Sequence, residues 1–219
     1  MKVGTDGVLL GAWVKCEKAT RILDVGCGSG LIGLMLAQKS LAIIDAIDID
    51  RNAFLQSGEN ASNCKWSNRI NIYHASLQEY AINSPNRYDL IVSNPPFFTN
   101  ALKPGDEARA NARHNHLLPF NDLVNCAWDL LLKEGSLYLI LPCESTPSVI
   151  DIAKNKGFFI KRICEIRPRK ELDPKRIMME LVKINPLEKH EETLVIEKEK
   201  RHDYTSEYFS LTKEFYLHF

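Results

Sequence analysis

The stretch Arg21-Ile22-Leu23-Asp24-Val25-Gly26-Cys27-Gly28-Ser29-Gly30 decides the fold. Its apolar first half predicts a short buried strand, and its second half carries three glycines at alternate positions. Residues 31–39 follow with apolar side chains at the spacing of a buried helix. Glycines let the backbone approach a ligand closely, and the first turn of a helix offers unpaired N–H groups. We therefore expect a small-molecule site where this strand turns into this helix.

Strands and helices alternate along the rest of the chain. Further strands are expected at residues 42–47, 69–73, 88–93, 136–141, 158–166 and 177–184, and helices at residues 51–64, 120–132 and 149–155. This order is typical of an α/β fold with a mostly parallel sheet and helices on both faces. Residues 167–176 are too few for a crossover helix, so the last strand is expected to run antiparallel to its neighbour. The sequence thus predicts a seven-stranded sheet with an antiparallel last strand.

The chain of 219 residues is long enough for one sizeable hydrophobic core, and a single domain is expected. Within residues 1–219 we expect an N-terminal cap segment (1–20), a core (21–186) and a C-terminal extension (187–219). The extension is highly charged at first and then rich in aromatic side chains. Because aromatic side chains favour burial, this segment is expected to pack back on the core.

The charge and cysteine patterns exclude several classes of protein. The chain has 28 Lys and Arg against 28 Asp and Glu, so any nucleic-acid contact must depend on local basic patches. No apolar run approaches the roughly 18 residues of a membrane span. The six cysteines form no C-x-x-C pair, and His114 and His116 have no carboxylate or cysteine at ligand spacing. We therefore expect a cytoplasmic protein with reduced thiols, no metal and no membrane segment.

The glycine pattern fits more than one cofactor. Residues 28–33 match G-x-G-x-x-G, and Asp48 lies where a ribose-binding carboxylate is expected. On this pattern alone a dinucleotide-dependent oxidoreductase stays open. Asp24 favours a different ligand, because a carboxylate two residues before the first glycine repels a pyrophosphate and attracts an ammonium group. S-adenosylmethionine (SAM) combines an ammonium group with a ribose, and it is the predicted cofactor.

Residues 24–30 resemble motif I of the Rossmann-type SAM-dependent methyltransferases. The resemblance implies a Rossmann-like methyltransferase fold and a ribose contact for Asp48. It also places Ser76 and Leu77 at the adenine ring of the cofactor, although many members carry Asp at the first of these positions. The cofactor-binding residues that it implies are Asp24, Gly26, Cys27, Gly28, Gly30, Asp48, Ile49, Ser76, Leu77 and Asn94.

A second motif, Asn94-Pro95-Pro96-Phe97, follows the expected strand at residues 88–93. It is similar to motif IV of the amino-methyltransferases, which methylate planar NH2 groups. Such an amine is a poor nucleophile, because its lone pair is delocalised. The Asn94 side-chain oxygen and the Pro95 carbonyl can each accept one N–H, which directs the lone pair at the methyl carbon. Pro95 and Pro96 fix the direction of that carbonyl and Phe97 can stack on a flat substrate, so all four residues are predicted to be catalytic.

The resemblance becomes narrower elsewhere in the chain. Residues 1–13, residues 112–114 and the closing residues 208–219 resemble the bacterial tRNA1(Val) (adenine-N6)-methyltransferases. This resemblance implies a tRNA partner and methylation of the exocyclic N6 of the adenine immediately 3′ of the anticodon, position 37. Basic side chains suit phosphate contacts, and aromatic rings can stack on a splayed base. The predicted RNA contacts, in a protein expected to be a monomer, are Phe97, Phe98, Arg113, His114, Arg167, Arg169, Lys170 and Arg176.

Other substrates stay open at this point. Candidates are guanine N2 in ribosomal RNA, adenine N6 in DNA and the N5 amide nitrogen of a protein glutamine. A SAM-binding partner subunit that has lost catalysis is a further alternative, which the intact motif at residues 94–97 argues against.

Overall fold

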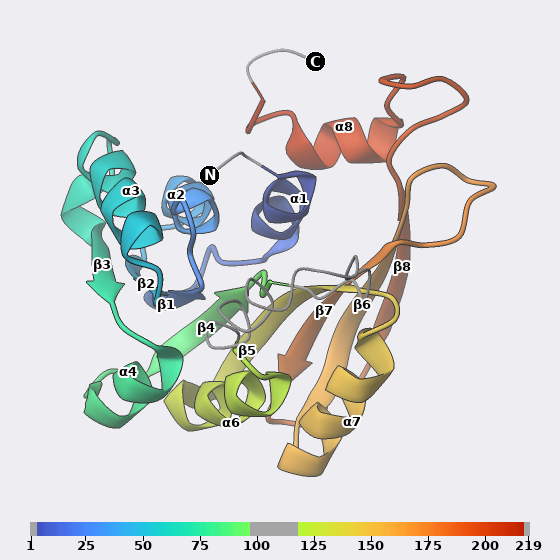
Figure 1. Cartoon of the computed structure of the whole chain (residues 1–219). Coiled ribbons are helices and arrows are strands. Elements are labelled where there is room, and N and C mark those ends of the chain that lie inside the picture. The colour runs from blue at the N-terminus through green and yellow to red at the C-terminus, as the bar shows by residue number, and fades with distance from the viewer. Residues whose placement is uncertain (1–3, 97–117, 217–219) are drawn as a thin grey trace, which may run out of the picture.

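The computed structural model describes residues 4–96 and 118–216 (Figure 1). In these residues one sheet of eight strands has the order β3-β2-β1-β4-β5-β7-β6-β8. β1 to β5 are parallel, β7 lies antiparallel between β5 and β6, and β8 is parallel to β6. The strands are Arg21–Val25 (β1), Ile43–Asp48 (β2), Ile70–His74 (β3), Tyr88–Ser93 (β4), Leu131–Pro142 (β5), Phe159–Arg167 (β6), Arg176–Val182 (β7) and His190–Val195 (β8).

The structure confirms the α/β fold and the antiparallel seventh strand, but the predicted count of seven strands is one too low. The additional strand, β8, lies in the C-terminal extension and pairs with β6 at the edge of the sheet. Its sequence HEETLV is charged and mostly exposed. It therefore lacks the apolar run by which the other strands were predicted.

Helices cover both faces of the sheet (Figure 1). α1, α2 and α8 share one hydrophobic cluster with one face, and α4, α6 and α7 share another with the opposite face. Tyr208 of α8 is 3% exposed and lies in the cluster that includes residues of α1 and α2. The sequence patterns did not predict the helices α1, α4 and α8. The helices are Thr5–Trp13 (α1), Leu31–Lys39 (α2), Arg51–Ser62 (α3), Leu77–Asn83 (α4), Phe120–Leu130 (α6), Thr146–Lys156 (α7) and Ser206–Thr212 (α8).

The order of the strands reverses between β1 and β4. β1 pairs with β2 on one side, and the chain returns past β3 to place β4 on the other side of β1. Ligands of such sheets bind beyond the carboxyl ends of the strands at this switch point. A buried hydrogen bond joins the two strand ends there, because Ser93 Oγ donates to the Val25 carbonyl at 2.9 Å.

A buried arginine joins the first helix to the last three strands. The Arg162 guanidinium lies 4.0 Å from the centre of the Trp13 ring, and its Nη2 is 3.2 Å from Glu192 Oε1. Its Nη1 is 3.9 Å from Glu180 Oε2, and Glu180 is only 1% exposed. α1 is therefore attached to β6, β7 and β8 through one charged side chain. No helix in residues 4–96 or 118–216 is long and apolar enough to cross a membrane.

We expect Arg162→Ala to lower the free energy of unfolding by about 3 kcal/mol, because it leaves the buried Glu180 without one of its two basic partners. Urea denaturation followed by circular dichroism measures this difference. Lys65→Ala, at an exposed position, is the control and should change stability by less than about 0.5 kcal/mol. An effect of Arg162→Ala as small as that of the control would contradict the prediction.

Candidate active site

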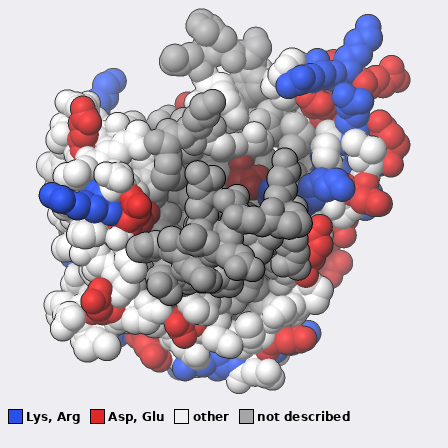
Figure 2. All heavy atoms as spheres, in the orientation of Figure 1, with Lys and Arg blue, Asp and Glu red and all other residues white. Residues whose placement is uncertain are grey.

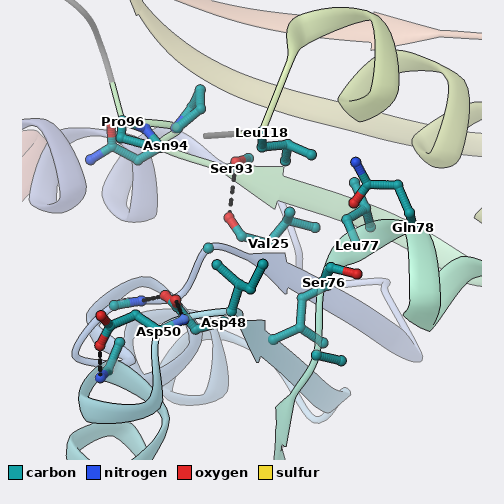
Figure 3. A pocket seen from close by; sticks show the side chains of 17 residues that line it. Val25, Asp48, Asp50, Ser76, Leu77, Gln78, Ser93, Asn94, Pro96 and Leu118 are labelled. Atoms are coloured by element: carbon teal, nitrogen blue, oxygen red, sulfur yellow. Dashed lines mark hydrogen bonds between the residues drawn. The ribbon is translucent and has the colours of Figure 1, made fainter. Parts of the chain in front are cut away.

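A cavity of about 510 Å³ opens at the carboxyl ends of β1 to β4 (Figure 3). This volume lies within the usual range for sites that bind small molecules. Its walls come from the ends of the four strands, from the starts of α3 and α4, and from Leu118, two residues before α6. They comprise Val25, Gly26, Gly28, Ile47, Asp48, Ile49, Asp50, Ala53, Ala75, Ser76, Leu77, Gln78, Ser93, Asn94, Pro95, Pro96 and Leu118.

The loop between β1 and α2 forms one wall of this cavity. Gly26, Gly28 and Gly30 have φ angles of 68°, 58° and 79°, a region that residues with a side chain rarely adopt. The amides of Gly26 and Cys27 both donate to the Ile47 carbonyl, at 2.9 and 3.0 Å. The alternating glycines thus let the loop fold tightly against the end of β2.

Asp48 holds this loop from the end of β2. Its Oδ2 accepts a hydrogen bond from Gly28 N at 2.8 Å, and its Oδ1 accepts one from Asp50 N at 2.9 Å (Figure 3). Each carboxylate oxygen keeps a second lone pair. Asp48 can therefore hold the loop and still accept hydrogen bonds from a ribose, and the predicted ribose contact fits its place in the cavity wall.

Asp24 lies beneath the loop and is absent from the cavity wall. It is 1% exposed, and its Oδ2 accepts a hydrogen bond from Gly33 N at 2.9 Å. Its Oδ1 is buried without a hydrogen-bond partner among the described residues. Burial, with a smaller contribution from the charge of Asp48, raises the pKa of the Asp24 carboxyl to about 7. This position does not support the predicted direct attraction of the cofactor's ammonium group.

Two other predicted cofactor residues also lie outside the cavity wall. Cys27 is buried, and burial raises the pKa of its thiol far above the usual value. Gly30 lies at the N-cap of α2, where a Cβ would come 3.3 Å from the Ser57 side chain. Both shape the loop, whereas Gly26, Gly28, Asp48 and Ile49 line the cavity itself.

The segment after β3 forms the opposite wall. Ser76 and Leu77, the predicted adenine contacts, line the cavity, and the Ser76 hydroxyl has two hydrogen-bond partners. It donates to Glu79 Oε2 at 2.7 Å and accepts from Glu79 N at 3.2 Å, which makes a capping box at the start of α4. The Ser-x-x-Glu spacing at these positions is a sequence signal for a helix start, and it could have predicted α4.

Gln78 also lines this wall, and the sequence analysis did not identify it. Its Nε2 donates to Asp122 Oδ2 of α6 at 2.8 Å. The contact joins residues that are far apart along the chain, so no local pattern indicates it.

Asn94, Pro95 and Pro96 follow β4 directly and line the cavity beside the end of β1 (Figure 3). Asn94 is half-buried, Pro95 is buried and Pro96 is exposed. The structure thus brings together the two motifs that the sequence analysis identified, the glycine loop and the Asn-Pro-Pro segment. The other predicted contacts in this part of the chain, Phe97, Phe98, Arg113 and His114, lie outside the described residues.

The predicted basic RNA contacts lie on or beside the loop between β6 and β7. Because β6 is parallel to β4, this loop is at the same edge of the sheet as the cavity, roughly 14 Å away at the usual strand spacing. Acidic and basic side chains alternate on the visible face of the molecule, at the upper right of Figure 2. Lys170 is exposed, and the three arginines form ion pairs: Arg167 with Glu165 at 3.2 Å, Arg169 with Glu197 at 3.6 Å and Arg176 with Asp6 at 2.8 Å.

Comparisons with known proteins identify the family. The methyltransferase small domain family matches residues 4–144. A tRNA1(Val) (adenine(37)-N6)-methyltransferase from Parabacteroides distasonis is 46% identical over 217 residues, which cover 99% of this chain and 91% of that protein. One from Trichodesmium erythraeum is 47% identical over 221 residues, with the same coverage of 99% and 91%. The chain belongs to the tRNA1(Val) (adenine(37)-N6)-methyltransferase family. The predicted resemblance, the methyltransferase class and SAM as the methyl donor are thereby confirmed.

Solved structures agree with the fold of this methyltransferase. A predicted O-methyltransferase from Agrobacterium tumefaciens has a TM-score of 0.73 at 20% identity, over 95% of this chain and 96% of the other. A ribosomal protein L11 methylase from Lactobacillus delbrueckii has a TM-score of 0.57 at 18% identity, over 80% and 75%. These similarities show a shared Rossmann-like fold.

The raised pKa of Asp24 predicts a pH-dependent difference in stability between the wild type and Asp24→Asn. The folded state keeps the proton up to about pH 7, whereas the unfolded chain loses it near the ordinary value. The stabilising contribution is therefore complete at low pH and is lost as the pH rises to about 7. We expect the wild type to lose on the order of 3 kcal/mol relative to Asp24→Asn between pH 4 and pH 7.

Urea unfolding of both proteins at several pH values measures this difference. The Asn oxygen can still accept the Gly33 hydrogen bond, so Asp24→Asn removes the titration with little change in shape. A stability difference that does not change with pH would contradict the raised pKa.

Proposed function

We propose that this methyltransferase transfers a methyl group from SAM to the exocyclic N6 of adenine 37 in tRNA1(Val). The observation that carries the proposal is the Asn94-Pro95-Pro96 segment at the wall of a cavity that also contains the glycine loop and Asp48. The names of relatives with 46% and 47% identity over nearly the whole chain support this substrate over other planar amines.

SAM supplies an electrophilic methyl group on its sulfonium sulfur. The protein has to orient the adenine amine, whose lone pair is delocalised into the ring. Asn94 Oδ1 and the Pro95 carbonyl each accept one N–H of that amine, so the lone pair is directed at the methyl carbon. As the N–C bond forms and the S–C bond breaks, positive charge develops on the nitrogen; these two oxygens stabilise it until one N–H proton is lost to water, so no strong base is needed. Because two consecutive prolines restrict the backbone, the carbonyl needs little reorganisation during transfer.

In this proposal the other parts of the cofactor contact the remaining walls of the cavity. Asp48 and the adjacent Ile49 lie at the end of β2, where they receive the ribose. Leu77 and Leu118 supply apolar surface for the adenine ring. The glycine loop and the end of β4 enclose the methionine part, since both lie at the switch point between β1 and β4.

The loop between β6 and β7 supplies a second contact with the tRNA. The ion pairs of Arg167, Arg169 and Arg176 are half-buried, and each arginine keeps about a third of its side-chain surface exposed to solvent. Phosphates can therefore compete with the carboxylates for these arginines. The expected monomeric state and cytoplasmic location stay predictions.

The substrate is tested with labelled SAM and four separate acceptors: unmodified tRNA1(Val), ribosomal RNA, DNA and a protein extract. We expect label in the tRNA alone, and nucleoside analysis should identify it as N6-methyladenosine. A tRNA1(Val) with guanosine at position 37 is the matched control and should accept no label. Label confined to ribosomal RNA, DNA or protein would contradict the proposed substrate.

Asn94→Ala should lower the single-turnover rate of methyl transfer by about 100- to 1000-fold, because one of the two acceptors that orient the amine is lost. The affinity for S-adenosylhomocysteine, measured by calorimetry, should stay within about threefold of the wild type, since the glycine loop and Asp48 are unchanged. Asn125→Ala, at an exposed position on α6, serves as the control and should change neither quantity. Near-wild-type turnover of Asn94→Ala would remove Asn94 from the mechanism.

A further inference from the structure

The adenine ring of the cofactor needs an acceptor for its exocyclic amine, and Ser76 is poorly suited to that role. The Ser76 hydroxyl donates its proton to Glu79 Oε2 and accepts from Glu79 N, so the capping box fixes its orientation and leaves it a single lone pair. The amine carries two N–H donors, so this wall needs a further acceptor, because a buried donor without a partner costs binding free energy.

Gln78 lies at this wall, two residues after Ser76 and in the first turn of α4. Figure 3 shows its carboxamide turned toward Leu118, on the side of the cavity that Ser76 and Leu77 also line. A glutamine carboxamide presents a donor on one side and an acceptor on the other. Its orientation decides which of the two faces the cavity.

Asp122 determines this orientation. Gln78 Nε2 donates to Asp122 Oδ2 at 2.8 Å, and a carboxylate has no hydrogen with which it could donate to a reversed carboxamide. The NH2 group is thus held toward α6. No described residue donates a hydrogen bond to Gln78 Oε1, which leaves this oxygen available as an acceptor at the cavity wall.

We infer that Gln78 Oε1 accepts a hydrogen bond from the exocyclic amine of the cofactor's adenine ring, and that Asp122 is the positioning residue that keeps this oxygen turned to the cavity. The inference deepens the proposed function, because it rests on SAM as the cofactor of the same site. It gives the site a means to select adenine over a purine that carries a carbonyl at the same position.

The distinctive consequence is discrimination against hypoxanthine. S-inosylhomocysteine differs from S-adenosylhomocysteine by a carbonyl oxygen in place of the amine. That oxygen would face Gln78 Oε1, so two acceptors would meet with no hydrogen between them. We expect the wild type to bind the adenosyl ligand at least about tenfold more tightly than the inosyl ligand.

The test measures both dissociation constants by calorimetry for the wild type and three variants, with thermal melting to check folding. Gln78→Ala should weaken binding of the adenosyl ligand about fivefold and leave the inosyl ligand nearly unchanged or tighter. Asp122→Asn should weaken the adenosyl ligand and strengthen the inosyl ligand, because Asn can also donate and so permits a reversed carboxamide. Ile82→Ala, on α4 but 83% exposed, is the control and should change neither constant.

A merely structural contact between α4 and α6 would change the melting temperature but not the ratio of the two constants. Equal weakening of both ligands by Gln78→Ala, or an unchanged ratio in Asp122→Asn, would overturn the inference while leaving the proposed function intact. If Gln78→Ala does not fold, the ratio in Asp122→Asn decides alone. Failure of the wild type to bind S-adenosylhomocysteine at all would contradict both the inference and the proposed function.

Discussion

Two buried or half-buried carboxylates hold the glycine loop, and the rest of the site depends on them. Asp48 accepts the Gly28 amide from the end of β2, while Asp24 accepts the Gly33 amide from beneath α2. These two bonds, with those from the Gly26 and Cys27 amides to the Ile47 carbonyl, offset part of the conformational entropy that the glycines lose on folding. The two carboxylates differ in burial and therefore in what they can bind. Asp48 keeps lone pairs for a ligand at the cavity wall, whereas Asp24 is buried deeply enough that its pKa rises to about 7.

The Asn94-Pro95-Pro96 segment is connected to this loop through the sheet. β1 and β4 are adjacent and parallel, with Val25 paired to Ser93, so the residues that follow them start about 5 Å apart. The hydrogen bond from Ser93 Oγ to the Val25 carbonyl keeps the two strand ends in register. Methyl transfer gains most of its rate from placing the amine and the methyl carbon correctly. A rigid strand pair supplies this placement better than two mobile loops.

Sequence patterns predict those parts of the molecule in which a residue type itself restricts the backbone conformation. Alternating glycines permit the left-handed φ angles of a tight loop and two prolines stiffen a strand end, so both motifs were placed correctly at the carboxyl ends of strands. Contacts between distant segments were missed, because one sequence carries no sign of pairing. Gln78 with Asp122, and Arg176 with Asp6, are separated by 44 and 170 positions. The edge strand β8 was missed for another reason, since main-chain pairing with β6 places a charged segment in the sheet.

The arginine pairs bear on how a chain with no net charge can bind tRNA. Arg167, Arg169 and Arg176 already face carboxylates, so a phosphate replaces one anion by another instead of meeting an isolated positive charge. When a phosphate replaces the carboxylate, the gain in electrostatic free energy is smaller than for phosphate binding to an unpaired arginine. The long-range attraction between tRNA and protein is also weak, because the chain has 28 charges of either sign. Under the proposed function, phosphate contacts therefore position the anticodon loop, and most of the selectivity arises where the adenine enters the cavity. There two acceptors at residues 94 and 95 must be matched by two N–H donors on one planar nitrogen, a requirement that a base without an NH2 group, such as uracil or hypoxanthine, cannot meet.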